Sequence, residues 1–474
     1  MDYEAVIGLE IHVQLNSATK MFCDCPNQPG DRPNRNTCPT CLWMPGAMAR
    51  LGQESLDKAA LTCMALNCEI QRRSAFDQKV YYYPDLPKGF QLSQFHKPLA
   101  RNGWLDITDE EGKPKRLRIH EVHMEEDVAK LVHETEGRTR ISLVDFNRAG
   151  APLVEIVTEP DMRNPRDAME FLRALRTQIR YAGTAECSME RGTMRADANI
   201  SLRPKGSSEL NTKVEVKNMN SIRHVGDAIV HEIQRQTERI NSGESIVLHT
   251  RLWDPDKGVT TPMRGKFSGP CVPDPSVPEI VASEEWLGDI RARLPEMPAQ
   301  KRERFVREYK LTRDDAVLMS SERDVAEYFE ATAKATTPSR AAQCIAAQVL
   351  PALRDRGQTP GNTPVTPQRL AELLNMVERD EVNAGAAKEI LVLLFKSDKS
   401  PAEIVEEGGF RQVSDTGELE GIVDEVLAAN PGAVADFGAG KKQAIGFLVG
   451  QVMRASKGKA NPKLVQQLLG SKLS

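Results

Sequence analysis

The chain has 474 residues, a formal net charge of −4, 40% hydrophobic residues and 27% charged residues. These proportions are typical of soluble globular proteins, and no apolar run approaches the roughly 20 residues that cross a bilayer, so a membrane protein is excluded. The slight net acidity excludes a protein that coats nucleic acid nonspecifically. The length exceeds one ordinary core, which predicts two or three domains.

The N-terminus carries Asp2 and Glu4 where an export signal would carry positive charge before an apolar stretch. We therefore expect a cytoplasmic protein. Without an export signal, an odd number of cysteines, nine, favours metal binding or free thiols over disulfides.

The first 290 residues alternate short β-rich runs with turns, which predicts a mixed α and β body. Strands are expected over residues 5–15, 140–146, 151–159, 198–204, 212–218 and 245–253, because these runs are rich in Val and Ile and bounded by Gly, Pro and Asn. Helical spacing predicts helices over 165–182 and 225–240. The proline-rich stretch 270–280 cannot be a central strand or a helix interior, and we expect a hinge there.

The later sequence changes to helical patterns. Helices are expected over 296–308, 323–334, 340–356, 367–379 and 383–396, and again from 419 onward. The turn-rich loop 357–367 is a second candidate linker. The fold class expected is therefore α+β, with a mixed body of residues 1–290, a helical domain of residues 291–405 and a small helical tail of residues 406–474.

Four cysteines near the N-terminus form a strong metal signal: Cys23, Cys25, Cys38 and Cys41. A CxC pair and a CxxC pair on two short loops offer four thiolates, which suit tetrahedral zinc. Such a site leaves no open position for a substrate, so the zinc would be structural and would pin the turn-rich segment between the pairs. Free buried cysteines are the alternative.

Carboxylates within strand-like runs form a second group. Glu10 and His12 are two residues apart, so on a strand they share a face opposite Leu9 and Ile11. The other acids are Glu125, Glu126 and Asp127 after His123, then Glu155, Asp197 and Glu215. Hard oxygen ligands with at most one imidazole suit magnesium, which accompanies ATP in phosphoryl transfer. Spacing does not show that these residues converge, and exposed acids in ordinary ion pairs are the alternative.

The segment KVYYYPDLPKGFQLSQ, residues 79–94, interleaves three tyrosines with Lys79 and Lys88 around a proline-rich turn. Such a loop could stack a base or hold a phosphate, whereas packed tyrosines are the alternative. The chain has no GxxxxGK[ST] phosphate loop and no GxGxxG fingerprint after a strand, so ATP would not bind through a Walker loop. It also has no GxSxG elbow, so nucleophilic catalysis is poorly supported.

Several motifs in colinear order resemble the B subunit of the tRNA-dependent amidotransferase. They are YEAVIGLEIHVQL, the two cysteine pairs, YYYPDLPKGFQLSQF, HMEED, LVDFNRAGAPLVEIVTEPD, MRADANISLRP, VEVKNMNS and GFLVGQVMRASKGKANPKLV. The resemblance covers nearly the whole chain. It implies an ATP- and magnesium-dependent enzyme that phosphorylates the side-chain carboxylate of misacylated Glu-tRNA(Gln) or Asp-tRNA(Asn), after which ammonia displaces phosphate.

The resemblance also implies site residues and partners. Its magnesium ligands map to His12, Glu125 and Glu155, and its acidic pocket and basic contacts map to Glu10, Glu126, Asp197, Glu215, Lys79 and Lys88. Ammonia would come from a glutaminase A subunit, with a C subunit completing the complex, and neither a membrane nor DNA is expected as a partner. The architecture implied is a cradle-shaped catalytic domain, a helical domain and a helical tail that grips tRNA.

The tail has a matching charge pattern. Residues 437–474 contain seven basic and no acidic side chains, namely Lys441, Lys442, Arg454, Lys457, Lys459, Lys463 and Lys472. A basic tail on an acidic body indicates a localised phosphate contact, and a solvated helix face is the alternative.

The sequence departs from the family pattern in the body. Relatives carry an aromatic, acidic segment after the Met-Arg pair, where this chain has GKFSGPCVPDPSVPEI and keeps only Pro273 and Asp274. Arg191 stands where relatives tend to have Glu, and Val80 replaces a typical Asn. A specialised paralogue or a tRNA-binding assembly scaffold without kinase activity is therefore the alternative function. A free-standing zinc-dependent RNA-binding protein is disfavoured by the many carboxylates.

Overall fold

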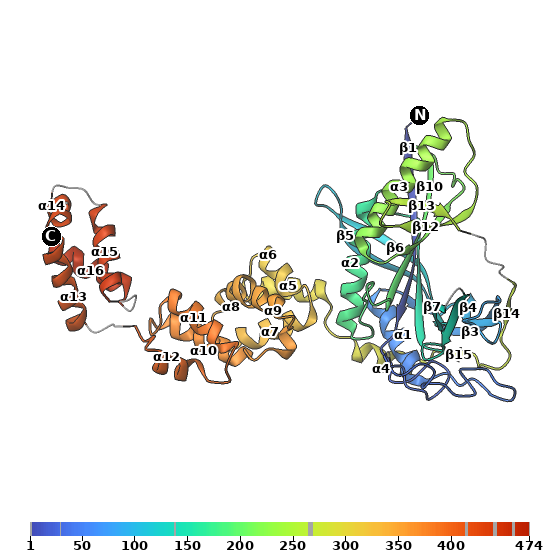
Figure 1. Cartoon of the computed structure of the whole chain (residues 1–474), viewed down its shortest axis with the longest axis horizontal. Coiled ribbons are helices and arrows are strands. Elements are labelled where there is room, and N and C mark those ends of the chain that lie inside the picture. The colour runs from blue at the N-terminus through green and yellow to red at the C-terminus, as the bar shows by residue number, and fades with distance from the viewer. Residues whose placement is uncertain are drawn as a thin grey trace. The chain divides into compact units, whose positions relative to one another are not determined.

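The computed structural model describes residues 2–28, 30–136, 139–263, 269–412, 416–438, 443–456 and 460–473 (Figure 1). The chain divides into two compact units, Met1–Pro298 and Ala299–Ser474. The first unit mixes strands and helices and the second is helical, which confirms the expected α+β class with a helical C-terminal part. Within the described residues, no helix combines the length and apolarity needed to span a bilayer.

A nine-stranded sheet forms the framework of the first unit, in the order β13-β12-β11-β10-β1-β9-β6-β5-β2. Neighbouring strands are antiparallel except β11 and β12, which run parallel. In chain order the strands are β1 (Tyr3–Gln14), β2 (Glu69–Ile70), β5 (Ala100–Thr108), β6 (Pro114–Glu126), β9 (Pro152–Thr158), β10 (Met194–Pro204), β11 (Val214–Met219), β12 (His249–Asp254) and β13 (Val259–Pro262).

One face of this sheet is apolar and lies in the core. Leu9, Ile11 and Val13 of β1 are at most 1% exposed, and they belong to the same core cluster as Phe171 and Ile229. Those two residues come from helices α2 (Pro165–Ala182) and α3 (Ile222–Asn241), which pack on the sheet. Because side chains alternate along a strand, Glu10 and His12 project from the opposite face, as the sequence predicted.

Helix α2 has the bounds that the sequence predicts. The Asn164 side chain caps it by accepting a hydrogen bond from the Asp167 N–H, and Pro165 fills the first turn, where its missing N–H costs nothing. The helix ends at Gly183, whose φ of 73° is the left-handed conformation that glycine adopts most easily.

A second, four-stranded sheet is centred on β3 (Arg73–Val80), which pairs with β4 (Phe90–Lys97), β14 (Cys271–Pro273) and β15 (Ile280–Val281). The last two strands come from the proline-rich stretch, so the prediction of a hinge there is wrong. The proline residues are tolerated because β14 and β15 are short edge strands, which need few ladder hydrogen bonds. Residues 264–268, which belong to the divergent segment, lie outside the described residues.

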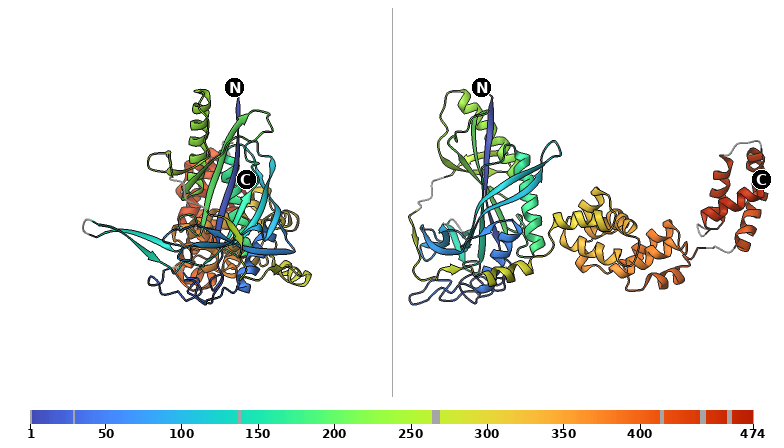
Figure 2. Two further views of the ribbon diagram at one scale, coloured as in Figure 1. Left: turned by 90° about the vertical axis from the view of Figure 1, so that its right-hand side faces the viewer. Right: turned by 180° about the vertical axis from the view of Figure 1, so that it is seen from behind.

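The remaining elements of this unit are a hairpin and two helices. Strands β7 (Lys130–Glu136) and β8 (Thr139–Asp145) pair only with each other among the described strands, and the hairpin extends away from the main sheet (Figure 2). Helix α1 (Gln53–Ala65) packs beside α2 and α4 (Glu284–Arg293).

The second unit begins with a set of short helices. They are α5 (Pro298–Glu308), α6 (Arg313–Met319), α7 (Arg323–Ala333), α8 (Pro338–Cys344), a π-turn (Ile345–Val349), α9 (Leu350–Asp355), a 3-10 turn (Pro360–Asn362), α10 (Pro367–Glu378), α11 (Ala384–Leu394) and α12 (Pro401–Gly408). The single helix expected over 340–356 contains the π-turn. Pro351 explains it, because the proline ring would clash with the carbonyl group four residues earlier in a regular helix.

The loop 357–367 does not behave as the expected linker. Its Val365 carbonyl accepts a buried hydrogen bond of 2.7 Å from the Tyr328 hydroxyl, and Val365 is fully buried. The loop is therefore part of the packed helical set, and that prediction is wrong.

The last four helices are α13 (Thr416–Ala429), α14 (Pro431–Gly438), α15 (Ala444–Ala455) and α16 (Pro462–Leu473). They share an apolar cluster of their own, built around Leu419, Val423, Leu448 and Val465. Of the basic residues singled out in the tail, Lys441, Lys442, Lys457 and Lys459, together with the Lys463 side chain, lie outside the described part of the chain.

Candidate active site and metal centres

The polar face of the main sheet carries charged side chains on five neighbouring strands, β11, β10, β1, β9 and β6. The register places Glu10 opposite Asp197 and His12 opposite both Arg195 on β10 and Glu155 on β9. Here they form a continuous row of ionisable groups across the centre of the sheet, which we call the polar face.

Three of these residues converge, as the resemblance implied. The ligand atoms of His12, Glu125 and Glu155 all lie within 4.8 Å of one another. His12 Nε2 is 3.6 Å from a Glu125 carboxylate oxygen and 3.8 Å from one of Glu155. We call these three residues the acidic triad. The convergence depends on β9, which lies between β1 and β6 in the sheet.

Charge and burial set the protonation of the triad. Burial and then the nearby Glu125 carboxylate raise the pKa of Glu155 to about 7. For Glu125, burial is outweighed by Lys79 and His12, so its pKa is held below the usual value. Burial disfavours protonation of His12, but the nearby carboxylates of Glu125 and Glu155 raise the pKa of its imidazole. Glu155 is therefore partly protonated at neutral pH when no cation is bound.

The triad suits a divalent cation. Glu125 is 1% exposed, and its Oε1 atom has no hydrogen-bond partner, a costly state for a buried charge. Two carboxylates and one imidazole on rigid strands provide the oxygen-rich ligand set of magnesium or manganese. A cation at this point would satisfy the Glu125 oxygen and neutralise both carboxylates.

Of the two lysines predicted from the tyrosine-rich segment, Lys79 contacts this centre and Lys88 contacts Glu126, the residue that follows Glu125 on β6. Lys79, at the end of β3, has its Nζ atom 3.7 Å from Glu125, and the Glu125 charge raises the pKa of the lysine against the effect of burial. Lys88 forms a buried ion pair with Glu126. The Glu126 carboxylate also accepts a hydrogen bond of 2.8 Å from the Leu92 N–H, so Glu126 is tied to β4.

The turn between β3 and β4 carries the tyrosines. Tyr82 is 74% exposed and Tyr83 is 48% exposed, so these two rings are not packed in the core. Tyr81 is more enclosed: burial, followed by the charges of Asp85 and Glu125, raises the pKa of its hydroxyl. The turn therefore presents aromatic surface to solvent beside the acidic triad.

The other predicted acids lie on the polar face with partners of their own. Glu10 accepts a hydrogen bond of 2.8 Å from Asn199. Asp197 and Glu215 share Lys217, whose Nζ atom is 2.5 Å from the first and 2.8 Å from the second. None of these three acids joins the group of ligand atoms within 4.8 Å, so they surround the triad without entering it.

Three charged residues of the polar face were not singled out as candidate ligands: His123, Arg195 and Lys217. His123 lies opposite Glu155, and its Nε2 atom is 3.0 Å from a Glu121 carboxylate oxygen, while Arg195 forms an ion pair of 3.0 Å with Asp127. The available signal was period two: Arg195 precedes Asp197, and Lys217 follows Glu215, by two residues.

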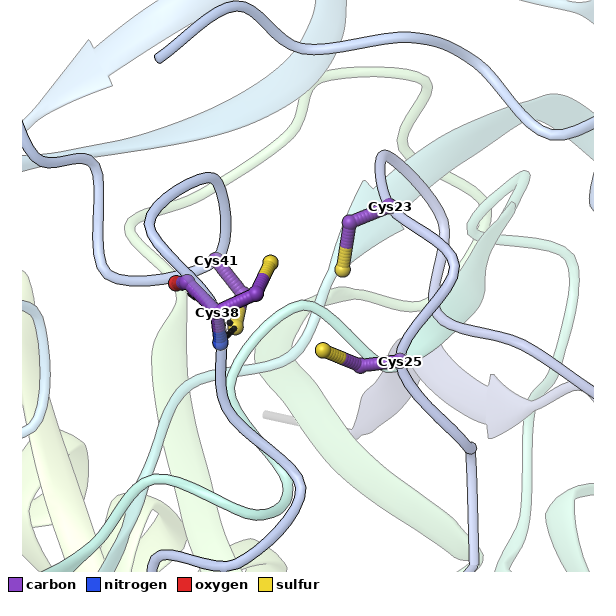
Figure 3. Close-up of side chains that lie close together, drawn as sticks. All are labelled: Cys23, Cys25, Cys38 and Cys41. Atoms are coloured by element: carbon purple, nitrogen blue, oxygen red, sulfur yellow. Dashed lines mark hydrogen bonds between the residues drawn. The ribbon is translucent and has the colours of Figure 1, made fainter.

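The four cysteines converge as their spacing predicted. The Sγ atoms of Cys23, Cys25, Cys38 and Cys41 all lie within 4.8 Å, and they point toward one another from two loops (Figure 3). A zinc ion with sulfur ligands at about 2.3 Å would bring the sulfur atoms to about 3.8 Å apart, a small contraction. A hydrogen bond with Cys23, then the Cys38 N–H and the charge of Lys20, lower the pKa of Cys41 to about 5, which favours a thiolate ligand.

Comparison with known families accounts for most of the chain. Residues 5–288 match the GatB/GatE catalytic domain family, and residues 327–473 match the GatB domain family. The chain belongs to the GatB family. The match to the catalytic domain contains the acidic triad, the lysines and the four cysteines, so the resemblance inferred from the motifs is confirmed.

Members of the GatB family are similar to this chain over its full length. It is 65% identical to a B subunit of the aspartyl/glutamyl-tRNA(Asn/Gln) amidotransferase of Syntrophus aciditrophicus, covering 100% of this chain and 99% of that protein. It is 46% identical to the corresponding protein of Geobacter sulfurreducens and 44% identical to that of Carboxydothermus hydrogenoformans, again over 100% of this chain and at least 99% of each relative.

Proposed function

We propose that this chain is the component of a tRNA-dependent amidotransferase that activates the side-chain carboxylate of Glu-tRNA(Gln) or Asp-tRNA(Asn) with ATP and converts it to the amide. The observation that carries the proposal is the acidic triad on the polar face of a chain 65% identical to an amidotransferase B subunit. A carboxylate resists attack by ammonia because its leaving group is poor. Transfer of the γ-phosphoryl group makes an acyl phosphate, and ammonia then releases inorganic phosphate.

His12, Glu125 and Glu155 are the residues that would hold magnesium. When bound, magnesium supplies charge neutralisation for the ATP phosphates. The rigid strands fix the three ligands, because each side chain comes from a different central strand of one sheet. Glu10, Asp197 and Glu215 complete the acidic pocket. Asn199 holds Glu10 by a hydrogen bond, and Lys217 holds Asp197 and Glu215 by ion pairs.

The lysines have different roles. Lys79 is 43% exposed at its side chain and can turn from Glu125 toward a phosphate or an acyl carboxylate. The Lys88 side chain is only 6% exposed and is committed to Glu126. Lys88 therefore holds Glu126, which directly follows Glu125 on β6, whereas Lys79 contacts the reacting groups.

Zinc at the four cysteines would be structural, since a closed tetrahedral site has no position for a substrate. The turn of Tyr82 and Tyr83 would contact the nucleotide end of a substrate, because an exposed ring beside a phosphoryl-transfer site can stack on a base. The divergent segment matters here as well. Its β14 pairs Cys271 with Lys79, so the departures from the family pattern lie next to a residue of the pocket.

The complex and its setting follow from the family. The A subunit would supply ammonia from glutamine, a C subunit would complete the assembly, and the terminal helices would bind tRNA outside its acceptor end. The chain would work in the cytoplasm. The three-part division at residues 290 and 405 remains our proposal for how these tasks are separated along the chain.

The experiment is to purify the chain with its A and C partners and to measure glutamine- and ATP-dependent conversion of Glu-tRNA(Gln) and Asp-tRNA(Asn). We expect amide formation on at least one of them. Normal tRNA binding without any conversion would instead establish the non-catalytic scaffold.

A further inference from the structure

The two cysteine loops, residues 23–25 and 38–41, connect to the end of β6 that carries Glu125 and Glu126 through Trp43 and Lys88. Trp43 follows the second loop in a tight turn in which its N–H donates to the Thr40 carbonyl at 3.0 Å. Its φ of 53° is a left-handed conformation that a bulky residue seldom adopts, so the turn is held by its surroundings. Trp43 is therefore placed by the cysteine loop rather than by its own preference.

Trp43 touches the Lys88–Glu126 pair. The Lys88 Nζ atom lies 4.8 Å from the centroid of the Trp43 ring and 5.1 Å from that of Phe90, and the two rings meet edge to face at 5.3 Å. Aromatic faces stabilise a desolvated cation. Since the Lys88 side chain is only 6% exposed, it is enclosed by two rings and Glu126.

A second connection runs through Lys20. This lysine is 1% exposed, and its Nζ atom lies 3.6 Å from Cys41 Sγ, 2.7 Å from the Asn36 carbonyl and 3.1 Å from the Phe146 carbonyl. These three partners are two backbone carbonyl groups and a cysteine sulfur, and none of them is a carboxylate. A buried ammonium group needs a counter-charge, and a thiolate at Cys41, 3.6 Å away, would supply it.

The Lys20 contact leads back to the same strand end. The chain turns at Phe146–Gly150 between β8 and β9, and in this corner the Gly150 N–H donates to the Asp127 carbonyl at 2.9 Å. The Asn36 N–H is fixed to the Asn147 side chain at 2.8 Å. The cysteine loops are thus connected to Asp127 through the corner at Phe146–Gly150, and to the Lys88–Glu126 pair through Trp43.

From these contacts we propose that the metal-loaded cysteine loops brace the end of β6, with Trp43 as the positioning residue that fixes the Lys88–Glu126 pair and, through the backbone of β6, the preceding Glu125 of the acidic triad. The catalytic part of this inference rests on the proposed function. The brace itself can be tested without the reaction. It predicts that the Lys88 side chain is shielded from solvent only while the cysteine loops hold their metal.

The first test measures shielding without any use of activity. Purified complex is labelled with acetic anhydride before and after removal of zinc, and the modification of Lys88 is quantified by mass spectrometry. We expect Lys88 to react several-fold faster after zinc removal, while exposed Lys97 reacts at an unchanged rate. Equal reactivity of Lys88 in the two states overturns the brace.

The second test uses substitutions. We expect Trp43→Ala to keep its zinc and its tRNA affinity but to lower kcat about tenfold, because a misplaced side chain is costly even when every reacting group remains. Trp43→Phe should stay within about threefold of the wild type, since a ring still faces Lys88. The matched control is Trp104→Ala on β5. It removes a similar cation–π contact, in which the Arg116 guanidinium carbon lies 3.5 Å from the centroid of the Trp104 ring, and it should leave kcat unchanged.

A combined perturbation decides whether the metal and Trp43 act along one path. Zinc removal should lower kcat in the wild type and have little further effect in Trp43→Ala. Two independent, multiplicative losses overturn the proposal, as does an unchanged kcat or a loss of zinc in Trp43→Ala. A wild-type complex that makes no amidated tRNA contradicts the proposed function alone, because the labelling of Lys88 still tests whether the cysteine loops shield that lysine.

Discussion

Glu125 lies deeper than the other carboxylates of the polar face, and its surroundings distinguish it chemically. It is 1% exposed and faces His12, Glu155 and Lys79, whereas Glu10 and Glu215 keep partly exposed positions with neutral or lysine partners. Removing one member of such a buried group leaves the others uncompensated. The triad is therefore the part of the pocket where single substitutions should separate chemistry from binding.

Lys79 gives the first prediction at this scale. Lys79→Met should lower kcat about a hundredfold, because a cation aimed at a transferring phosphoryl group stabilises charge that develops in the transition state. Steady-state kinetics of amidation by the reconstituted complex measure the effect. Lys97→Met is the control, since Lys97 pairs with Glu279 on the surface and does not contact the triad. Equal kcat values for the two variants would remove Lys79 from the reaction.

Tyr82 gives the second prediction. Tyr82→Ala should raise the KM of the substrate whose base stacks on it about tenfold, because base stacking contributes about 1–3 kcal/mol, and Tyr82→Phe should preserve the affinity. Separate KM values for ATP and for aminoacylated tRNA identify which ligand uses the ring. Phe95, which is 58% exposed at the other end of β4, supplies the control Phe95→Ala. Unaltered KM values for both substrates in Tyr82→Ala would exclude stacking.

Individual elements differ in how well the sequence predicts them. Strand β1 and helix α2 were predicted nearly residue for residue, because β1 alternates from Ile7 onward and α2 has a cap, a first-turn proline and a terminal glycine. Strands β3 to β6 were not predicted. The sequences of β3, β4 and β6 are rich in Lys, Arg, Gln and His, and β5 contains Asn102 and Gly103, so their strand conformation depends on pairing across the sheets rather than on local preference.

The candidate site shows the same division. Spacing placed Glu10 and His12 on one face of a strand, and it grouped the four cysteines. It could not show that Glu125 and Glu155 meet His12, since their convergence depends on the position of β9 between β1 and β6. That grouping came from the resemblance to the family. Arg195 and Lys217 were missed although their period-two spacing from Asp197 and Glu215 places each pair on one face, because spacing does not show which residues on neighbouring strands they contact.

Helix α2 supports the sheet from its apolar face, which leads to a stability prediction. Phe171 is fully buried, so Phe171→Ala should lower the free energy of unfolding by about 3–5 kcal/mol through lost burial and a residual cavity. Urea unfolding of the full chain measures the change. Arg173→Ala, on the exposed side of the same helix, should stay within about 0.5 kcal/mol of the wild type. Similar losses for both variants would contradict this packing of α2.

At the scale of the whole molecule, helices α13 to α16 pack around an apolar cluster of their own. Deleting the residues after Leu419 should weaken tRNA binding, while ammonia production by the partner glutaminase persists. Filter binding of tRNA and glutaminase assays of the complex measure the two effects. An affinity for tRNA equal to that of the full chain would contradict the assignment of the tail to tRNA.

The most direct measurement of the central claim follows phosphoryl transfer itself. The complex is mixed with radiolabelled ATP and Glu-tRNA(Gln) without glutamine, and phosphate transfer is compared between the wild type and Glu125→Gln, with Glu111→Gln as an exposed control. A neutral amide cannot neutralise the cation charge, so we expect Glu125→Gln to lose phosphoryl transfer while its tRNA affinity is retained. Transfer by Glu125→Gln at the wild-type rate would contradict the account.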